Sequence, residues 1–286
     1  MEIRIRDLLS NLQPKQVDNS TKIRLGSAGD GGYVIMDHSN LTNTVLYSYG
    51  IEENDSFDQH YHNKYGALVR QYDFSIPATT VRDGFTFTRE GISHEKTENC
   101  DTFAEHIIKN GDTDKRIFLK LDVEGAEWLT LLHMPEYLLK QCNQIVIELH
   151  DLSCLGKSTD YPAIDLEQKV AVMEKMNKLF HLWHVHANNH ASVHIIDGYK
   201  VPDVIEVTFI NKELHEGGRP SEEIFPTKYD QACYVRMQDH TLDYWPFYPK
   251  SEIVAEKKPF LERKLARLRR NLSTRKWQHI SKKGHK

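Results

Sequence analysis

The chain has 286 residues, of which 39% are hydrophobic and 27% are charged, and its formal net charge is −4. This composition describes a soluble globular protein large enough for a sizeable α/β core, and no apolar run approaches the roughly 18 residues of a membrane span. The N-terminus lacks the apolar centre of a signal peptide, so we expect a cytoplasmic protein.

The N-terminal part, residues 1–43, is expected to cover an α/β domain that occupies residues 44–250. Within this cover, residues 23–36 carry the run Asp30-Gly-Gly-Tyr33 between two short apolar segments. Glycines placed in this way favour a tight turn, so the run predicts a hairpin or a loop that approaches another group closely.

From residue 44 onward, strands alternate with helices, which is the pattern of a parallel sheet built from βαβ units. Four helices with apolar stripes at about 3.6-residue spacing are predicted over residues 56–65, 101–110, 126–142 and 166–177, the second and fourth with Asp101 and Asp165 as N-caps. The seven predicted strands are residues 45–49, 68–74, 86–88, 117–122, 144–149, 179–186 and 204–211.

Two carboxylates follow the fourth of these strands. Residues 117–121 form a nearly continuous apolar run, as expected of a central strand covered on both faces. Asp122 and Glu124 come next, at the edge where open α/β sheets bind ligands, and extended backbone would point both to the same side. The alternative is that both acids only cap the helix that follows Gly125.

The next two strands bring further polar groups to the same edge. One ends Glu148-Leu-His150, and because it follows directly in the chain we expect it beside the Asp122 strand. Asp122, Glu148 and His150 then offer ligands for a divalent metal such as Mg²⁺, and the alternative is a hydrogen-bonded cluster without metal. The other strand ends at His186, which is either a general base or a core histidine.

The cysteines indicate no metal or redox motif. Cys100, Cys142, Cys154 and Cys233 are scattered, and no pair has the C-x-x-C spacing of a zinc site or a dithiol. We therefore expect reduced thiols.

The first strand of the domain ends at a single glycine, Gly50. A phosphate cradle needs several glycines, so a cofactor without phosphate suits this position better. About twenty residues later Asp73 follows the second strand, from where an acidic side chain can bind ribose hydroxyls.

These motifs together resemble a known family. Residues 119–128, LKLDVEGAEW, are similar to the signature of FkbM-type methyltransferases, which use S-adenosylmethionine. The resemblance continues at residues 30–34, 47–51, 72–73 and 186–189 and so spans about residues 23–212. It implies an α/β, Rossmann-like class I methyltransferase fold with a seven-stranded, mostly parallel sheet and helices on both faces. It also implies methyl transfer to oxygen, commonly to a hydroxyl of a sugar, a glycan or a sugar-containing intermediate.

The resemblance implies roles for single residues. Asp122 and Glu124 would hold and deprotonate the acceptor, with His150 and His186 as further catalytic candidates, and in metal-dependent sugar O-methyltransferases one such acid holds Mg²⁺. The loop from residue 30 to residue 33 would close over the cofactor or the acceptor. The residues implied to bind the cofactor are Asp30, Gly31, Gly32, Tyr33, Gly50, Glu52, Asp73, Phe74, Ile92 and Asp122.

The C-terminal part differs from the rest of the chain in composition and charge. After residue 212 a Pro, Gly and aromatic-rich segment predicts an irregular cover or substrate lid. Residues 251–286 carry twelve Lys and Arg against three Glu, and leucines at 4-3-4 spacing over residues 261–272 predict a basic amphipathic helix. This helix would dock to an acidic partner or to the inner membrane surface near a lipid-linked acceptor, or would pack on its own domain or form a dimer.

The basic tail also suggests an alternative function, a nucleic-acid-binding or RNA-modifying protein. The rest of the chain has 25 basic and 38 acidic residues, which would repel a phosphate backbone, so nucleic acid is not the expected partner. A relative that binds the cofactor without transferring a methyl group is the other alternative.

Overall fold

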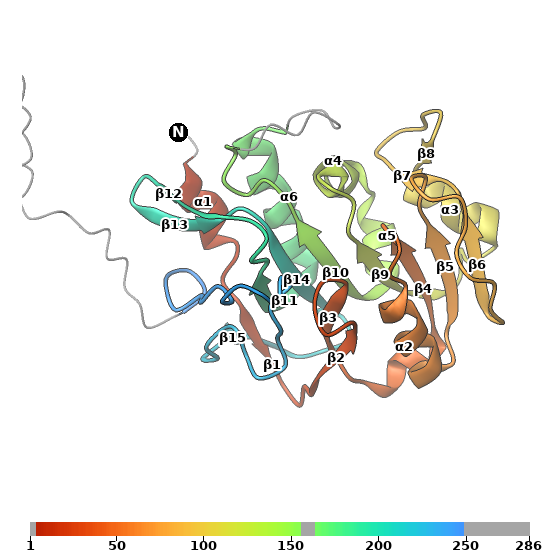
Figure 1. The fold of residues 1–286 in the computed structure, drawn as a ribbon, viewed down its shortest axis with the longest axis horizontal. Coiled ribbons are helices and arrows are strands. Elements are labelled where there is room, and N and C mark those ends of the chain that lie inside the picture. The colour runs from red at the N-terminus through yellow and green to blue at the C-terminus, as the bar shows by residue number, and fades with distance from the viewer. Residues whose placement is uncertain (1–3, 156–163, 249–286) are drawn as a thin grey trace, which may run out of the picture. The chain divides into compact units, whose positions relative to one another are not determined.

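The computed structural model describes residues 4–155 and 164–248, and the statements below concern these residues. The tail predicted over residues 251–286 lies outside them. A seven-stranded sheet in the order β11-β14-β10-β9-β4-β5-β6 forms the centre (Figure 1). Only β14 runs antiparallel to its neighbours, so the predicted, mostly parallel sheet is confirmed. The strands are β4 (Thr44–Tyr49), β5 (Leu68–Tyr72), β6 (Phe85–Thr88), β9 (Arg116–Leu121), β10 (Cys142–Leu149), β11 (Phe180–Ala187) and β14 (Ile205–Asn211).

All seven predicted strands are present, with small differences at their ends. The second ends at Tyr72 and the fourth at Leu121, so Asp73 and Asp122 belong to the loops that follow. Tyr49 of β4, Leu121 of β9 and Ile147 of β10 are in register, so these three strands finish at one edge of the sheet. This edge is where the acidic residues of the sequence come together.

The helices lie on both sides of the sheet, as predicted. Ile117, Leu119 and Leu121 of β9 contribute to the core that contains α1 (Ile5–Ser10), α3 (Phe103–Asn110), α4 (Ala126–His133), α5 (Glu136–Gln141) and α6 (Leu166–Leu179). Phe118 points to the other face and packs with α2 (Ser56–Tyr65) and the hairpin of β2 (Lys22–Gly26) and β3 (Gly32–Met36). Side chains alternate between the faces of a strand, and both faces are apolar because both are covered.

Three local predictions about the helices are corrected or confirmed. The single helix predicted over residues 126–142 is two helices, because Pro135 lacks an N–H and holds the chain extended between α4 and α5. Thr102 rather than Asp101 caps α3, accepting a hydrogen bond from Glu105 N–H at 3.3 Å. Asp165 caps α6 as predicted, in a capping box with Gln168.

Short elements complete the described part of the chain. The predicted hairpin between residues 23 and 36 is β2 with β3, whereas the other small sheets were not predicted. Residues 221–248 are mostly irregular, as expected, and bury Phe225 and Phe247 in the main core. No helix in the described ranges is both long enough and apolar enough to cross a bilayer. The remaining elements are β1 (Lys15–Val17), η1 (Ser39–Asn43), β7 (Gly91–Ile92), β8 (Cys100–Asp101), β12 (Val193–Ile196), β13 (Tyr199–Pro202) and β15 (Gly217–Pro220).

Candidate active site

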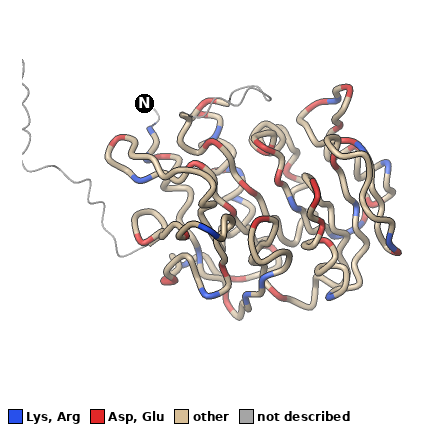
Figure 2. Tube along the Cα trace, viewed as in Figure 1, with Lys and Arg blue, Asp and Glu red and all other residues tan. Residues whose placement is uncertain are grey.

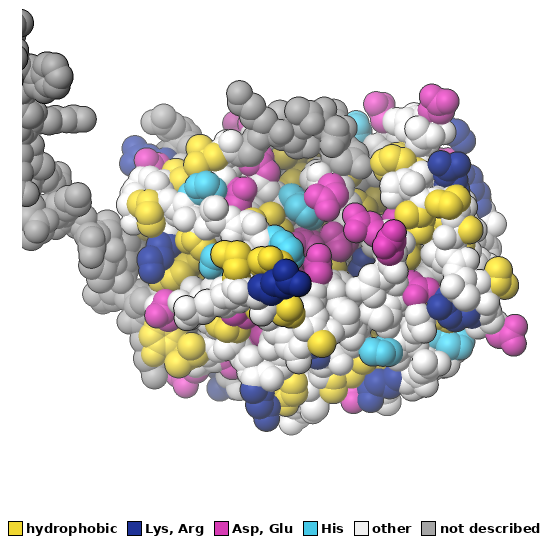
Figure 3. All heavy atoms as spheres, in the orientation of Figure 1, with side chains coloured by type: hydrophobic (Ala, Val, Ile, Leu, Met, Phe, Trp, Pro, Cys, Tyr) yellow, Lys and Arg dark blue, Asp and Glu magenta, His cyan; other side chains and the backbone are white. Residues whose placement is uncertain are grey.

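Two adjoining pockets open at the carboxyl edge of β4, β9 and β10. The larger one, the acidic pocket, has a volume of about 440 Å³. It is lined by the ends of β9 and β10, by the loops after β4, β9, β10 and β11, and by the β2–β3 loop. Figure 3 shows acidic side chains gathered near the middle of the face in view, with histidines beside them. The charged and polar residues that line the acidic pocket are Asp30, Glu52, Asn54, Lys120, Asp122, Glu124, Glu148, His150, Asn188 and His190.

The smaller pocket, of about 140 Å³, lies around the loop after β5 and is called the Asp73 pocket here. It shares Gly50, Glu52, Asp122 and Glu124 with the acidic pocket, so a ligand in one is next to a ligand in the other. Six of the residues predicted to bind the cofactor line the Asp73 pocket, and Asp30 and Gly31 line the acidic pocket. The six are Gly50, Glu52, Asp73, Phe74, Ile92 and Asp122.

Position 50 needs a glycine because its backbone lies very close to the backbone of Asp122. It has φ +75°, and a Cβ placed on it would lie 1.6 Å from the carbonyl oxygen of Asp122. Lys120 Nζ donates to the Gly50 carbonyl at 2.7 Å, which ties the end of β4 to β9. A side chain at this position would therefore separate the two loops that both pockets share.

Asp73 organises the loop after β4. Its Oδ2 accepts hydrogen bonds from the backbone N–H groups of Ile51 and Glu52, both at 2.9 Å, and its Oδ1 accepts from Ser75 N–H at 2.7 Å and Ser75 Oγ at 2.6 Å. Burial raises the pKa of Asp73, but the bonds from Ser75, Glu52 and Ile51 outweigh it, so the pKa is lowered overall. The carboxylate stays charged at the floor of its pocket.

Asp122 is held at the junction of the two pockets. Tyr33 donates its hydroxyl to Asp122 Oδ2 at 2.6 Å, and Lys120 Nζ lies 3.9 Å from the same oxygen. Lys120 and Tyr33 are both buried, on the face of the sheet that carries the β2–β3 hairpin. The Asp-Gly-Gly-Tyr run therefore contributes to the site through Tyr33, whereas neither Gly32 nor Tyr33 is among the described residues lining the pockets.

Asp122 and Glu124 do not cap the following helix. Its N-cap is Gly125, which has no side chain for capping, and the Gly125 N–H donates to Glu127 Oε2 at 2.8 Å. Glu124 has φ +54°, so the backbone is not extended between the two acids and the reason given for their convergence was wrong. They converge nevertheless, since ligand atoms of Asp122, Glu124 and His150 all lie within 4.8 Å of one another.

His150 enters the pocket as a cation. Its backbone N–H donates to Glu127 Oε1 at 2.7 Å, and its ring Nδ1 lies 3.2 Å from the same oxygen. Burial lowers the pKa of His150, but the hydrogen bond and charge of Glu127 raise it overall to about 10. In this protonation state the imidazole cannot accept a proton from the acceptor. Its other nitrogen, Nε2, lies 3.6 Å from Glu124 Oε2.

Glu148 is the buried acid of the pocket. Its Oε1 accepts a hydrogen bond from Asn188 Nδ2 at 2.5 Å. Burial first, and then the nearby charges of Asp122 and Glu206, raise the pKa of Glu148 well above its ordinary value. Glu148 is not among the residues whose ligand atoms lie within 4.8 Å of one another. The predicted metal site combined Asp122, Glu148 and His150, whereas in the structure Glu124 is the residue that lies close to Asp122 and His150.

His186 is not among the described residues that line either pocket. It is buried between Glu206 and Asp239, on the face of the sheet where Lys120 and the β2–β3 hairpin lie. Lys120, Asn188 and His190 belong to the acidic pocket. Asn188 is part of the run 186–189 that carries the family resemblance, whereas Lys120 and His190 were not singled out from the sequence. A lysine inside an otherwise apolar strand was the available signal for Lys120, because such a side chain needs a partner.

Comparison with known proteins agrees with this geometry. The family model described as Methyltransferase FkbM domain matches residues 18–178, more than half of the chain. The match runs from the β2–β3 hairpin to α6 and includes Gly50, Asp73, Asp122 and His150, whereas β11 and β14 follow it. Among curated proteins, no match to the chain is found. The chain belongs to the FkbM methyltransferase family.

Proposed function

We propose that the protein is an S-adenosylmethionine-dependent O-methyltransferase that acts on a hydroxyl of a sugar, a glycan or a sugar-containing intermediate. The observation that carries the proposal is the pair of pockets that share Gly50, Glu52, Asp122 and Glu124. Methyl transfer needs the donor and the acceptor in line with little water between them, and adjoining pockets allow that alignment.

The Asp73 pocket fits a nucleoside-type cofactor that carries no phosphate. Tyr49, Tyr72 and Phe74 supply aromatic surface, and Glu52 and Asp73 supply carboxylates on the same pocket. The chain has no glycine-rich phosphate cradle after β4, and the acids at the junction favour a positive sulfonium over an anion. S-adenosylmethionine, when bound, supplies the activated methyl group.

The acidic pocket favours an acceptor without negative charge. Five carboxylic acids line it, against Lys120 and two histidines, so a phosphate group would be repelled. Figure 2 shows lysines and arginines interspersed with acids along the described trace. Carboxylates and the Asn188 amide are suitable partners for the hydroxyl groups of a neutral sugar. These observations support the sugar acceptor over the nucleic-acid alternative.

We assign proton removal from the acceptor to Asp122. A general base works when its oxygen is held in a fixed position, and the hydroxyl of Tyr33 fixes Asp122 at 2.6 Å. Glu124 has a side chain that is 72% exposed, so it is less restrained and would orient the acceptor instead. Lys120 and His150 balance the negative charge around the reacting hydroxyl.

The site fits Mg²⁺ poorly. Asp122 and Glu124 offer carboxylate oxygens, but His150 offers a ring nitrogen where Mg²⁺ prefers oxygen, and Asp122 already accepts a hydrogen bond from Tyr33. Glu148 lies outside the group that converges within 4.8 Å. The proposed reaction therefore needs no metal at this site, and we expect methyl transfer to continue when Mg²⁺ is left out of the assay.

The proposed location and partners rest on sequence alone. A cytoplasmic enzyme that meets a lipid-linked acceptor at the inner membrane surface would use the basic tail over residues 251–286. Sedimentation of the full chain with anionic and neutral vesicles tests this part separately, and equal recovery with both would remove it.

Calorimetric titration with S-adenosylhomocysteine tests the proposed cofactor. Binding in the micromolar range is expected, and absence of binding at high micromolar concentration would refute S-adenosylmethionine use. Matched panels of neutral glycosides and their phosphorylated counterparts test the acceptor class. We expect transfer of the methyl group only to the neutral set, and preference for the phosphorylated set would contradict the reading of the acidic pocket.

A further inference from the structure

Three ionisable residues lie in one row across three neighbouring strands. Glu148 of β10 is directly opposite Glu206 of β14, and Glu206 is directly opposite His186 of β11. Directly opposed residues of antiparallel strands point to the same face with their Cβ atoms about 5 Å apart. Two carboxylates in such positions repel each other unless a cation lies close by.

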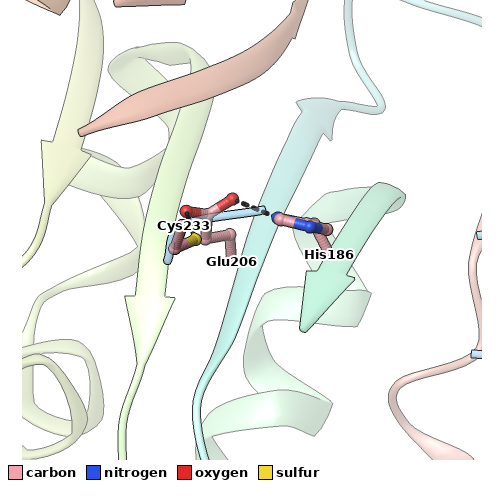
Figure 4. Close-up of side chains that lie close together, drawn as sticks. All are labelled: His186, Glu206 and Cys233. Carbon is pink, nitrogen blue, oxygen red and sulfur yellow. Dashed lines mark hydrogen bonds and ion pairs between the residues drawn. The ribbon is translucent and has the colours of Figure 1, made fainter. Parts of the chain in front are cut away.

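The outer end of this row meets a cysteine from the irregular segment over residues 221–248. His186 Nδ1 lies 2.8 Å from Glu206 Oε2, and Cys233 Sγ lies 3.3 Å from Glu206 Oε1. Figure 4 shows the three side chains close together; His186 and Glu206 come from β11 and β14, and Cys233 comes from the irregular segment. All three are buried, and their ligand atoms lie within 4.8 Å of one another.

We propose that His186, Glu206 and Cys233 bind one divalent transition metal ion, with Zn²⁺ as the best fit. Zinc takes imidazole nitrogen, carboxylate oxygen and thiolate sulfur at about 2.0–2.3 Å in tetrahedral geometry, which separates neighbouring ligand atoms by roughly 3.3–3.5 Å. One ligand atom of each residue lies within 4.8 Å of the others, so small side-chain rotations would bring the three to that spacing around an ion. A soft thiolate beside an imidazole disfavours Mg²⁺ and Ca²⁺.

A second carboxylate supports a metal at this place. Asp239 faces the other ring nitrogen of His186, with Oδ2 at 3.0 Å and Oδ1 at 3.2 Å from Nε2. Histidines that ligate a metal usually donate their second N–H to a carboxylate, which fixes the tautomer and orients the ring. Asp239 thus leaves Nδ1 as the ligating nitrogen, and Nδ1 is the one that faces Glu206.

The position of the site gives the ion a structural role. Cys233 and Asp239 belong to the segment that crosses the carboxyl edge of the sheet, and Asn189 also holds this segment, accepting from Tyr234 N–H at 2.7 Å. The carbonyl of Cys233 lies 3.3 Å from the position of a Cβ built on Gly29, beside the loop that forms part of the acidic pocket. A metal here would fix the segment to β11 and β14 next to that wall.

Three protein ligands leave one coordination position for a water molecule or a further ligand. Without a metal, the same residues would form a hydrogen-bonded network in which a charged His186 lies between two carboxylates and the thiol donates to Glu206. The two arrangements differ in metal content and in whether the sulfur is bound to a metal.

The test measures metal binding by the full chain and does not depend on methyl transfer. After treatment with a chelator, the protein is titrated with Zn²⁺ and, separately, with Co²⁺, whose thiolate complexes absorb by charge transfer in the near ultraviolet. We expect one equivalent of metal per chain and the thiolate band in the wild type and in Cys154→Ala, a control that removes an exposed thiol. Cys233→Ala is expected to lose the band.

Asp239→Asn provides a second variant in which every ligand remains. Loss of an outer carboxylate typically weakens metal binding by about 10-fold to 100-fold, so this variant should bind Zn²⁺ more weakly even if Cys233→Ala does not fold. Absence of metal binding by the folded wild type at micromolar Zn²⁺ would establish the hydrogen-bonded network instead. Binding that is unchanged in both variants would place the metal elsewhere and would also overturn the proposal.

Discussion

Replacing Tyr33 by phenylalanine removes a single hydroxyl and tests whether Asp122 is held in position for proton transfer. That hydroxyl donates to Asp122 Oδ2 at 2.6 Å, and Tyr33 is 2% exposed. A hydrogen bond to a charged group contributes about 1.5–3 kcal/mol, and because Asp122 borders a pocket that water can enter, we expect the lower part of that range. The predicted loss in the free energy of unfolding is about 1.5–2 kcal/mol.

The effect on catalysis should exceed what the loss of stability explains. Without the hydroxyl, Asp122 keeps no short hydrogen bond from a described side chain, since Lys120 Nζ lies 3.9 Å away and His150 lies within 4.8 Å, and its carboxylate can turn away from the acceptor. A tenfold fall in rate corresponds to about 1.4 kcal/mol, so we expect kcat/KM to fall by roughly tenfold or more. The assay follows S-adenosylhomocysteine production with the acceptor identified from the neutral panel, at a temperature where both proteins are folded.

Tyr65→Phe is the matched control. Tyr65 belongs to the same core cluster and also donates to an aspartate, Asp37 Oδ1 at 2.8 Å, but it is not among the described residues lining either pocket. Chemical denaturation should show losses of similar size in both variants, whereas only Tyr33→Phe should lose activity. Full activity in Tyr33→Phe, with stability lowered as in the control, would show that the hydroxyl does not position the base.

The remaining predictions address the base, the cofactor loop and a buried cation. Asp122→Asn should lower kcat by roughly 10²–10⁴ while S-adenosylhomocysteine still binds. The control Asp114→Asn, at an exposed carboxylate, should change neither kcat nor cofactor binding. Activity near the wild-type level in Asp122→Asn would mean that another group takes the proton. Gly50→Ala should abolish cofactor binding in calorimetry, because the added Cβ would collide with the Asp122 carbonyl. Gly66 also has a positive φ, +65°, but a Cβ there would have no atom within 4 Å, so Gly66→Ala should bind the cofactor normally with a small loss of stability. The folded-state pKa of His150 is raised from 6.5 to about 10, so its contribution to stability is complete below pH 6.5 and disappears as pH rises to about 10. Denaturation curves across that range should fall less steeply in His150→Gln, and an unchanged pH profile would refute the buried cation.

The sheet could be predicted from the sequence because its strands are covered on both faces. A run such as residues 117–121 is apolar almost throughout for that reason, and the polar residue that follows each run marks the edge of the sheet. The hairpin around Asp30 was also visible, since glycines at a chain reversal have few other uses. The interruption at Pro135 was present in the sequence too, but the apolar spacing continued across it and predicted one helix.

The contacts of the candidate site were harder to predict because they join distant parts of the chain. Tyr33 and Asp122 are separated by 89 residues, and no spacing rule connects them. Glu124 reaches the pocket through a left-handed backbone conformation that its residue type does not indicate. Cys233 and Asp239 belong to a segment without periodicity, so their approach to His186 follows only from the tertiary fold.

The acids at this edge of the sheet give a reason for a lysine near the carboxyl end of the buried strand β9. Glu148 and Glu206 are adjacent on the hairpin face of the sheet, with Asp122 close enough to raise the pKa of Glu148. Lys120 lies at the Asp122 end of this row, and His186 lies at the other end between Glu206 and Asp239. Positive charge at both ends, from Lys120 and from either the proposed metal ion or a protonated His186, offsets part of the repulsion but leaves the acids that face the pocket in excess. The edge is therefore stable enough to form and remains negative enough to favour a neutral acceptor beside a positively charged methyl donor.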